Sequence, residues 1–382
     1  MGRKLPPLWL SVSALTAGIT AAFGVARWIN HFATDPYEED FRLYYVAAKI
    51  GLNYGWSHIY DLDLERRLSS VFPAPGNVID SMHNYVTPEP MAWLLVPFTP
   101  LSVPVGFLLW TVLSLLLLIG AWLLVCPGKG LARITLLLIA LAIWPMHYTF
   151  WLGQTAALSI ALLALTWWLL EREHWSLAGV ALSVAVFLKP QLVLLLPIAL
   201  LVSGRWRPVV AFAVSSAVLG GASLALMGAH GIASYQSSVA YTSTNLIHSV
   251  MTYAWFGRGS VATTIELTLG AVALALAWFR RDRMDIVFAL GIVGSTASAS
   301  YLHEYDPAVF VLPAWILLRA RLSLPQGLWL LLGVLAAQLI AIAIFRPMLV
   351  WEAGWILLLG AEPWLLRNFQ FAAPFRRAAE AH

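Results

Sequence analysis

Long apolar segments recur along this chain from one end to the other, separated by shorter polar segments. Many approach the roughly 20 residues that an α-helix needs to cross a bilayer. They are continuous rather than alternating, which predicts helices and not the strands of a membrane barrel. The candidate spans are 8–29, 102–125, 133–150, 155–171, 176–188, 191–204, 208–227, 261–279, 284–301, 307–319, 326–345 and 348–366. The pattern predicts an all-α polytopic membrane protein, a bundle of about 11–12 transmembrane helices.

Composition agrees with this fold class. Of the 382 residues, 60% are hydrophobic and only 11% are charged, whereas soluble domains have about 25% charged residues. The first apolar segment is too long for the core of a signal peptide, so we expect it to remain as a helix. No low-complexity linker interrupts the chain, and we predict a single domain over residues 1–382.

The basic residues predict the orientation. About 15 of the 23 lie in one alternating set of short loops and in the two termini. By the positive-inside rule this set is cytoplasmic, which places both termini there and the segments 30–101, 228–260 and 302–306 outside. The net charge of +4 is small and predicts no nucleic-acid partner. The chain has neither a Gly-Lys-Ser/Thr phosphate loop nor a dinucleotide fingerprint, so we expect no nucleotide site.

The long external segment 30–101 has two predicted elements. Residues 40–49 have an apolar stripe at helical spacing, which predicts an amphipathic helix on the membrane surface behind an acidic N-terminus. Met91–Val96 is too short to span and is followed by Pro97 and Pro100. We interpret it as a re-entrant piece.

Two acidic clusters lie on the external side. Asp40 ends a run that also includes Asp35, Glu38 and Glu39. A carboxylate beside an apolar surface can act as a general base, although acids at a helix start also serve as caps. His303, Glu304 and Asp306 form the second cluster. His303 could orient or relay a proton for Asp40 if the two meet, but a purely structural junction accounts for this cluster equally well.

Further polar residues interrupt the apolar pattern. Lys189 separates two short apolar runs that suggest a broken hairpin, with the lysine at its outer tip. A lysine there should pair with an anion, such as a phosphate, or extend to the headgroups. Gln154 follows Gly153 in a tight external turn and could bind a sugar hydroxyl or cap the next helix. Segment 228–260 is rich in aromatic and polar residues, including Arg258, which suits either a carbohydrate site or an ordinary loop. Two histidines could join the carboxylates around a divalent cation, but the spacing matches no dedicated metal-ligand motif, so we expect no metal and no cofactor.

Five motifs, taken in their order along the chain, resemble those of a known family. They are Asp40-Phe41-Arg42-Leu43-Tyr44-Tyr45-Val46-Ala47-Ala48, Tyr85-Val86-Thr87-Pro88-Glu89-Pro90, Leu152-Gly153-Gln154, the stretch from Ala178-Gly179 to Leu188-Lys189-Pro190, and His303 ahead of a proline-containing span. Together they resemble glycosyltransferase family 87, the polyprenyl-phosphate-mannose-dependent α-mannosyltransferases of the GT-C class. The family often has Tyr-Pro-Pro where this chain has Val86-Thr87-Pro88, and here Glu89 interrupts the apolar run that follows.

The resemblance implies a membrane enzyme of the bacterial inner membrane whose active site is periplasmic. Its donor would be a polyprenyl-phosphate sugar, most often mannose, and its acceptor a glycolipid or glycan among the membrane lipids. Asp40 would be the general base of an inverting transfer and His303 its partner. Lys189, with Arg258 as a second candidate, would hold the departing phosphate, and Gln154, Tyr44 and Tyr45 would shape the sugar pocket.

Other classes remain open from the residues alone. A multi-pass transporter or lipid flippase would also use an intramembrane lysine in a broken hairpin. A non-catalytic assembly subunit and an oligosaccharide ligase or polymerase are further alternatives. Against transport, no inverted repeat is visible, and the charges gather on one side.

Overall fold

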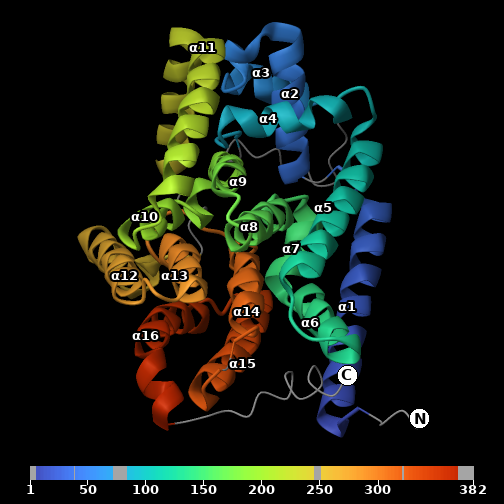
Figure 1. Cartoon of the computed structure of the whole chain (residues 1–382). Coiled ribbons are helices and arrows are strands. Elements are labelled where there is room, and N and C mark those ends of the chain that lie inside the picture. The colour runs from blue at the N-terminus through green and yellow to red at the C-terminus, as the bar shows by residue number, and fades with distance from the viewer. Residues whose placement is uncertain (1–5, 38, 72–83, 245–250, 321, 369–382) are drawn as a thin grey trace.

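The computed structural model describes residues 6–37, 39–71, 84–244, 251–320 and 322–368 (Figure 1). Within these ranges the chain is helical and forms no β-sheet. The residues outside these ranges include Glu38, Arg321, positions 245–250 of the second external segment, and the terminal basic residues Arg3, Lys4, Arg376 and Arg377. The helices are α1 (Leu8–Thr34), α2 (Glu39–Tyr54), α3 (Leu62–Ser69), α4 (Glu89–Leu95), α5 (Val103–Val125), α6 (Gly130–Ala142), α7 (Trp144–Leu152), α8 (Ala156–Glu171), α9 (Trp175–Leu188), α10 (Leu195–Val202), α11 (Trp206–Thr244), α12 (Ser260–Phe279), α13 (Met284–Ala297), α14 (Val311–Leu317), α15 (Leu324–Leu339) and α16 (Arg346–Asn368).

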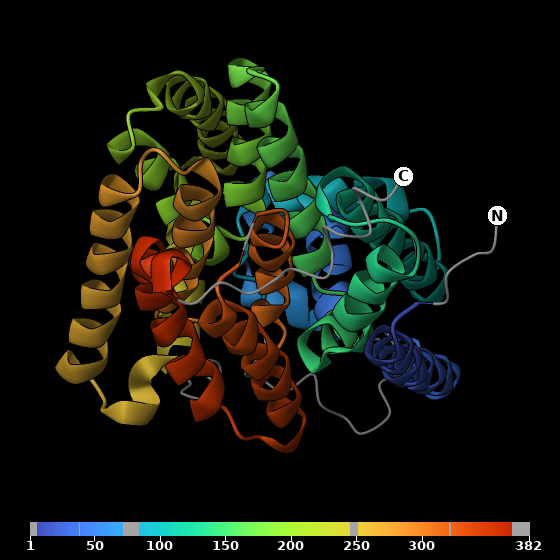
Figure 2. The same cartoon turned by 60° about the horizontal axis from the view of Figure 1, so that its bottom comes forward.

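The protein is an all-α, multi-pass membrane protein. Five of the described helices are long and apolar enough to cross a bilayer, namely α1, α5, α11, α12 and α15. Most of the other apolar segments form shorter helices, so long straight helices account for only part of the 11–12 crossings expected from the sequence. The outer surfaces of the long helices are apolar, as lipid contact requires. Figures 1 and 2 both place α1 and α12 on opposite sides of the bundle.

The span predicted over 133–150 is not one continuous helix. This stretch forms α6 and α7, which are bent by 61° at a break and could cross the membrane only as a bent pair. Ile143 between them has extended backbone angles, and Pro145 stands near the start of α7. Pro145 has no N–H to bond the Leu141 carbonyl, and its ring would clash with that carbonyl, which explains why α6 cannot continue through it and the helix restarts here.

The helix predicted over 40–49 forms as α2, but it does not lie on the surface. Residues 41–48 and Ile50 are all buried, because α2 is enclosed by neighbours that the sequence pattern does not show. Figure 1 shows α2 grouped with α3 and α4 at one end of the molecule, beside α11. The re-entrant piece corresponds to α4, a seven-residue helix that contacts α2. The helices α2, α3 and α4 of the external segment thus share one apolar core with α5, to which Leu188 of α9 and Met227 of α11 also contribute.

The second external segment begins as helix rather than loop. The span predicted over 208–227 continues as α11 to Thr244, with a kink at Gly228, whose φ of 58° and ψ of −169° are non-helical. Glycine is the residue that adopts such angles without strain. Beyond the kink, Asn84 Nδ2 donates a hydrogen bond to the Ser238 carbonyl at 3.3 Å. The kinked helix therefore packs against the first external segment.

Glu65 connects α3 to Tyr85, which precedes α4 in the same external segment. Its two carboxyl oxygens accept hydrogen bonds from the Tyr85 N–H at 2.9 and 3.2 Å. The side chain is buried, and burial raises the pKa of the Glu65 carboxyl to about 8. A carboxyl in this environment keeps its proton in the folded protein at a pH where the unfolded chain has lost it.

We expect this carboxyl to make the protein less stable as the pH rises. Since the folded-state pKa is the higher one, the folded state binds more protons between the unfolded pKa of about 4.3 and about 8, and stability falls across that window. Glu65→Gln keeps a hydrogen-bond acceptor but cannot ionise, so its unfolding midpoint in detergent should vary less between pH 5 and pH 8.5. Asp63→Asn on the same helix is the control, because the Asp63 side chain is 97% exposed. Equal pH dependence of Glu65→Gln and wild type would contradict this prediction.

Candidate active site

Gln154 is held against α2 by a tight turn. Gly153 ends α7 with a left-handed φ of 72°. A Cβ at this position would lie 2.8 Å from Phe41 Cβ, so only glycine lets the turn approach α2 so closely. The Gly153 carbonyl accepts a hydrogen bond from the buried Trp110 indole at 2.8 Å. Gln154 is therefore presented to the first turn of α2, where Asp40 lies.

The Gln154 amide connects three of the predicted site residues. Its Nε2 donates to Asp40 Oδ2 at 2.8 Å. Its Oε1 accepts from the Tyr44 hydroxyl at 3.0 Å and from Lys189 Nζ at 3.2 Å. The Gln154 amide oxygen thus faces two donors and its nitrogen faces a carboxylate. These partners favour this orientation of the amide over the flipped one. Because Gln154 is buried, it fixes the distance and angle between Asp40 and Lys189.

Lys189 lies at the break between α9 and the 3₁₀ turn η3 (Pro190–Leu192). The sequence predicted an anionic partner, and the structure places one within the protein: Lys189 Nζ is 2.5 Å from Asp306 Oδ1, and both side chains are buried. The ammonium also lies 4.2 Å from the centre of the Tyr305 ring. The lysine is therefore enclosed in the bundle rather than extended to the headgroups.

The loop before the 3₁₀ turn η6 (Asp306–Phe310) brings His303 to the same place. Asp306 Oδ2 accepts a hydrogen bond from the His303 N–H at 2.7 Å. The His303 ring stacks on Tyr305, with ring centres 5.2 Å apart. Burial, and next the charge of Asp40, raise the pKa of the Tyr301 hydroxyl. Asp306 is joined to Asp40 through Lys189 and Gln154, so the two acidic clusters of the sequence lie in one site.

Two predicted residues do not join this network. The Tyr45 hydroxyl donates to the carbonyls of Leu101 at 2.8 Å and Thr99 at 3.3 Å, so Tyr45 fastens α2 to the start of α5. Arg258 lies in an exposed position between the 3₁₀ turn η5 (Tyr253–Phe256) and α12. The described contacts do not place Arg258 at Asp40 or Lys189.

The structure adds Asp306, Tyr305 and Tyr301 to the residues selected from the sequence. Asp306 belongs to the acidic cluster already visible in the sequence, and its partner Lys189 was expected to need an anion. Their pairing was not evident because the two residues are far apart in the chain. The tyrosines gave no signal of their own, since aromatic residues are frequent at membrane interfaces.

For the glycosyl transfer that the resemblance implies, we expect Tyr44→Phe to lower kcat/KM about 5- to 10-fold without unfolding the protein. The change removes the hydroxyl that bonds Gln154 Oε1 and keeps the buried ring, and one such hydrogen bond contributes about 1 kcal/mol. The measurement is steady-state kinetics of purified enzyme. Tyr45→Phe is the matched control, because it removes two bonds that do not reach Gln154. An equal kinetic loss in both variants would contradict a role for the Tyr44–Gln154 bond.

These features define a polytopic membrane protein with a buried polar site built from four separate segments. The model of glycosyltransferase family 87 matches residues 85–300, more than half of the chain. The chain belongs to this family, and it is a membrane glycosyltransferase. The matched range includes Gln154 and Lys189, begins after Asp40 and ends before His303. Neither the curated proteins nor the solved structures compared with the chain give a significant match.

Proposed function

We propose that the protein transfers a sugar, most often mannose in this family, from a polyprenyl-phosphate donor to a glycolipid or glycan acceptor at the periplasmic face of a bacterial inner membrane. The observation that carries the proposal is the Asp40–Gln154–Lys189–Asp306 network, which joins a potential base to a buried cation. Such a pairing suits a reaction in which a hydroxyl loses a proton while a phosphate leaves.

In the proposed reaction, the acceptor oxygen attacks the anomeric carbon as the bond from that carbon to the phosphate oxygen breaks. The proton of the acceptor hydroxyl passes to Asp40, and the electron pair of the broken bond remains on the polyprenyl phosphate. Attack from the opposite face inverts the anomeric configuration. Holding the two reactants in contact supplies much of the acceleration, and the base adds roughly 10²- to 10⁴-fold. The residues need no cofactor for this step.

Each neighbouring residue has a proposed task. His303 orients the attacking group or relays its proton, while Gln154 and Tyr44 hold Asp40 and contact the sugar. An ammonium has three N–H donors. Two face Asp306 and Gln154, and we assign the third to a phosphate oxygen of the donor. Tyr45 supports the sugar pocket through its packing, and Arg258 is a second candidate for the phosphate.

The contacts support the proposed orientation. All four segments of the network come from loops that the basic-residue pattern puts outside. A separate ion pair joins Arg319 Nη1 to Glu171 Oε2 at 2.8 Å, and both of these residues come from the loops assigned to the cytoplasm. Contacts that stay within one set of loops are expected when the two sets lie on opposite sides of a membrane.

The test uses purified protein in vesicles that contain a labelled polyprenyl-phosphate sugar and extracted cell-envelope glycolipids. We expect a labelled glycolipid or glycan and release of polyprenyl phosphate, both identified by mass spectrometry. Mannose, glucose, arabinose and galacturonate donors are compared, and a nucleotide sugar is the negative control. Transfer directly from the nucleotide sugar would contradict the proposal. Movement of lipid across the bilayer without a covalent product would favour the flippase alternative.

A further inference from the structure

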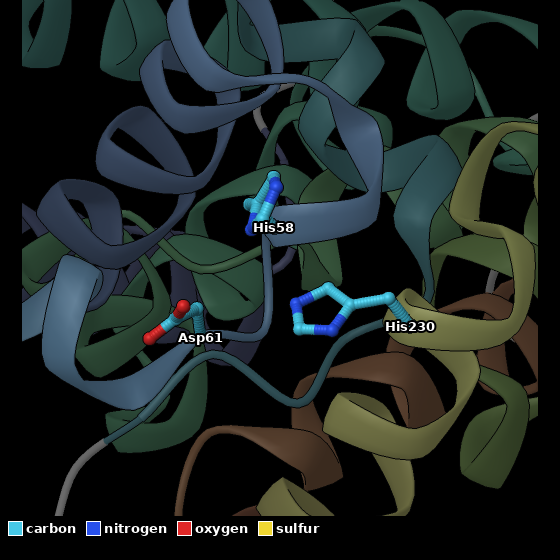
Figure 3. A group of neighbouring side chains, drawn as sticks. All are labelled: His58, Asp61 and His230. Carbon is cyan, nitrogen blue, oxygen red and sulfur yellow. The ribbon is translucent and has the colours of Figure 1, made fainter.

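Two histidines and an aspartate meet at a second place, away from the Asp40 network. His58 ends the 3₁₀ turn η1 (Trp56–His58), Asp61 precedes α3, and His230 follows the kink of α11. One potential ligand atom from each residue lies within 4.8 Å of the other two. Figure 3 shows the His230 ring reaching from α11 toward His58 and the Asp61 carboxylate. The centres of the two imidazole rings are 4.8 Å apart.

The Asp61 carboxylate is oriented by the start of α3. Its Oδ1 accepts hydrogen bonds from the backbone N–H groups of Asp63 at 3.1 Å and Leu64 at 3.2 Å, as an N-cap. Both bonds use the same oxygen, Oδ1, so the carboxylate is fixed to the first turn of α3. A carboxylate fixed by hydrogen bonds in this way is the usual arrangement for a metal ligand, because its position is set before the metal binds.

The backbone holds His230 close to His58. A Cβ on the next residue of α11, Gly231, would lie 3.1 Å from the Ser57 carbonyl oxygen and 3.2 Å from Ser57 Cα. These distances are tighter than ordinary van der Waals contact, so the main chains of α11 and η1 approach each other closely here. The kink at Gly228 directs this part of α11 toward η1. Two chain segments far apart in sequence are thereby held at a separation that the histidine side chains can span.

We propose that His58, Asp61 and His230 bind one divalent transition-metal ion, with Zn²⁺ the preferred metal. Imidazole nitrogens suit zinc better than calcium or magnesium, which favour oxygen ligands. Zinc commonly has four ligands at about 2.0–2.1 Å in a tetrahedron, which places the ligand atoms about 3.3–3.4 Å apart. Small rotations of the side chains, chiefly of the exposed His230, would bring the three ligand atoms from their observed separations to this distance. A water completes the coordination.

The metal would act as a clamp between the first external segment and α11. Tyr60, next to Asp61, stacks on Tyr85 with ring centres 5.5 Å apart, and Tyr85 lies edge-on to Tyr44 at 6.3 Å. The clamp would therefore stabilise the packing of α2, α3 and α4 against α11. A ligand that binds only the folded state raises its apparent stability by mass action. This inference does not depend on which sugar or acceptor the enzyme uses.

The test uses the full-length protein purified in detergent with a tag free of histidine, after treatment with a chelator and desalting. We expect one Zn²⁺ per chain by elemental analysis after equilibration, and a higher unfolding temperature in Zn²⁺ than in Mg²⁺. Co²⁺ should give a visible absorption spectrum from imidazole and carboxylate ligation. His230→Ala should weaken binding by more than the roughly 10- to 100-fold lost when only a partner of a metal ligand is removed.

Two further variants make the test specific. Asp61→Asn preserves an N-cap, because asparagine caps helices as well as aspartate does, and should still reduce metal binding. His174→Ala is the matched control, since His174 is an exposed histidine before α9 and should leave binding unchanged. The proposal is overturned if wild-type protein takes up no Zn²⁺, or if His230→Ala and wild type bind it with equal stoichiometry and affinity. Metal bound equally by every variant would be adventitious.

Discussion

Asp40→Asn is expected to reduce kcat by roughly 10²- to 10⁴-fold while changing the donor KM little. The asparagine side chain has the same shape and can still accept the hydrogen bond that Gln154 Nε2 gives to Asp40 at 2.8 Å. What it loses is the ability to take the proton of the acceptor hydroxyl, and general-base catalysis accounts for a factor of this size. The measurement is the initial rate of transfer from a polyprenyl-phosphate sugar by purified enzyme.

The control for this variant is Asp35→Asn in the same acidic run. Asp35 Oδ1 accepts a hydrogen bond from the Tyr37 N–H at 3.2 Å, so Asp35 shapes the connection between α1 and α2. We expect near wild-type rates from this control and a similar unfolding temperature for both variants. If folded Asp40→Asn retained most of the wild-type rate, Asp40 would not be the base. The proposed mechanism would then need another proton acceptor.

The second large effect is expected from the buried Lys189–Asp306 pair. Removing one partner leaves an uncompensated buried charge, which costs about 3–5 kcal/mol. Lys189→Met and Asp306→Asn should each destabilise the protein by this amount, measured from unfolding by SDS titration in mixed micelles. The double variant should be less destabilised than the sum, because neither charge then remains without its partner. Asp306→Asn should also disturb His303, whose N–H bonds Asp306 Oδ2 at 2.7 Å.

The ion pair between Arg319 and Glu171 is the matched control. Its 2.8 Å distance is short, but the side chains are 39% and 31% exposed, and pairs near water contribute only about 0–1 kcal/mol. Arg319→Met should therefore have a small effect. Additive losses in the Lys189 and Asp306 variants would show that the two residues do not act as a pair.

Lys189 has two roles in the buried network. Lys189 neutralises Asp306 and supports Gln154, so its substitution changes the architecture of the site as well as any contact with phosphate. Lys189→Arg keeps the charge but not the compact shape of an ammonium. For this reason, kinetic losses in Lys189 variants are informative about donor binding only in variants whose unfolding curves match wild type.

The sequence by itself determined the class of protein and pointed to several residues that the structure brings together in the candidate site. Apolar runs near the span length require a helical membrane protein because buried backbone groups must bond within each segment. Asp40, Gln154, Lys189 and His303 stood out because polar residues next to such runs are costly unless they are paired or used. These conclusions rest on short-range pattern and composition, which a single chain displays directly.

Only the tertiary structure decided which of these residues meet. The helix carrying Asp40 has the pattern of a surface helix, and only its neighbours make it buried. Contacts between distant segments pair Lys189 with Asp306 and bring His230 close to His58. They also direct the Tyr45 hydroxyl to the start of α5 instead of to the network. Such contacts arise from how helices pack and from glycines that let main chains touch, and neither is written in the periodicity of any one segment.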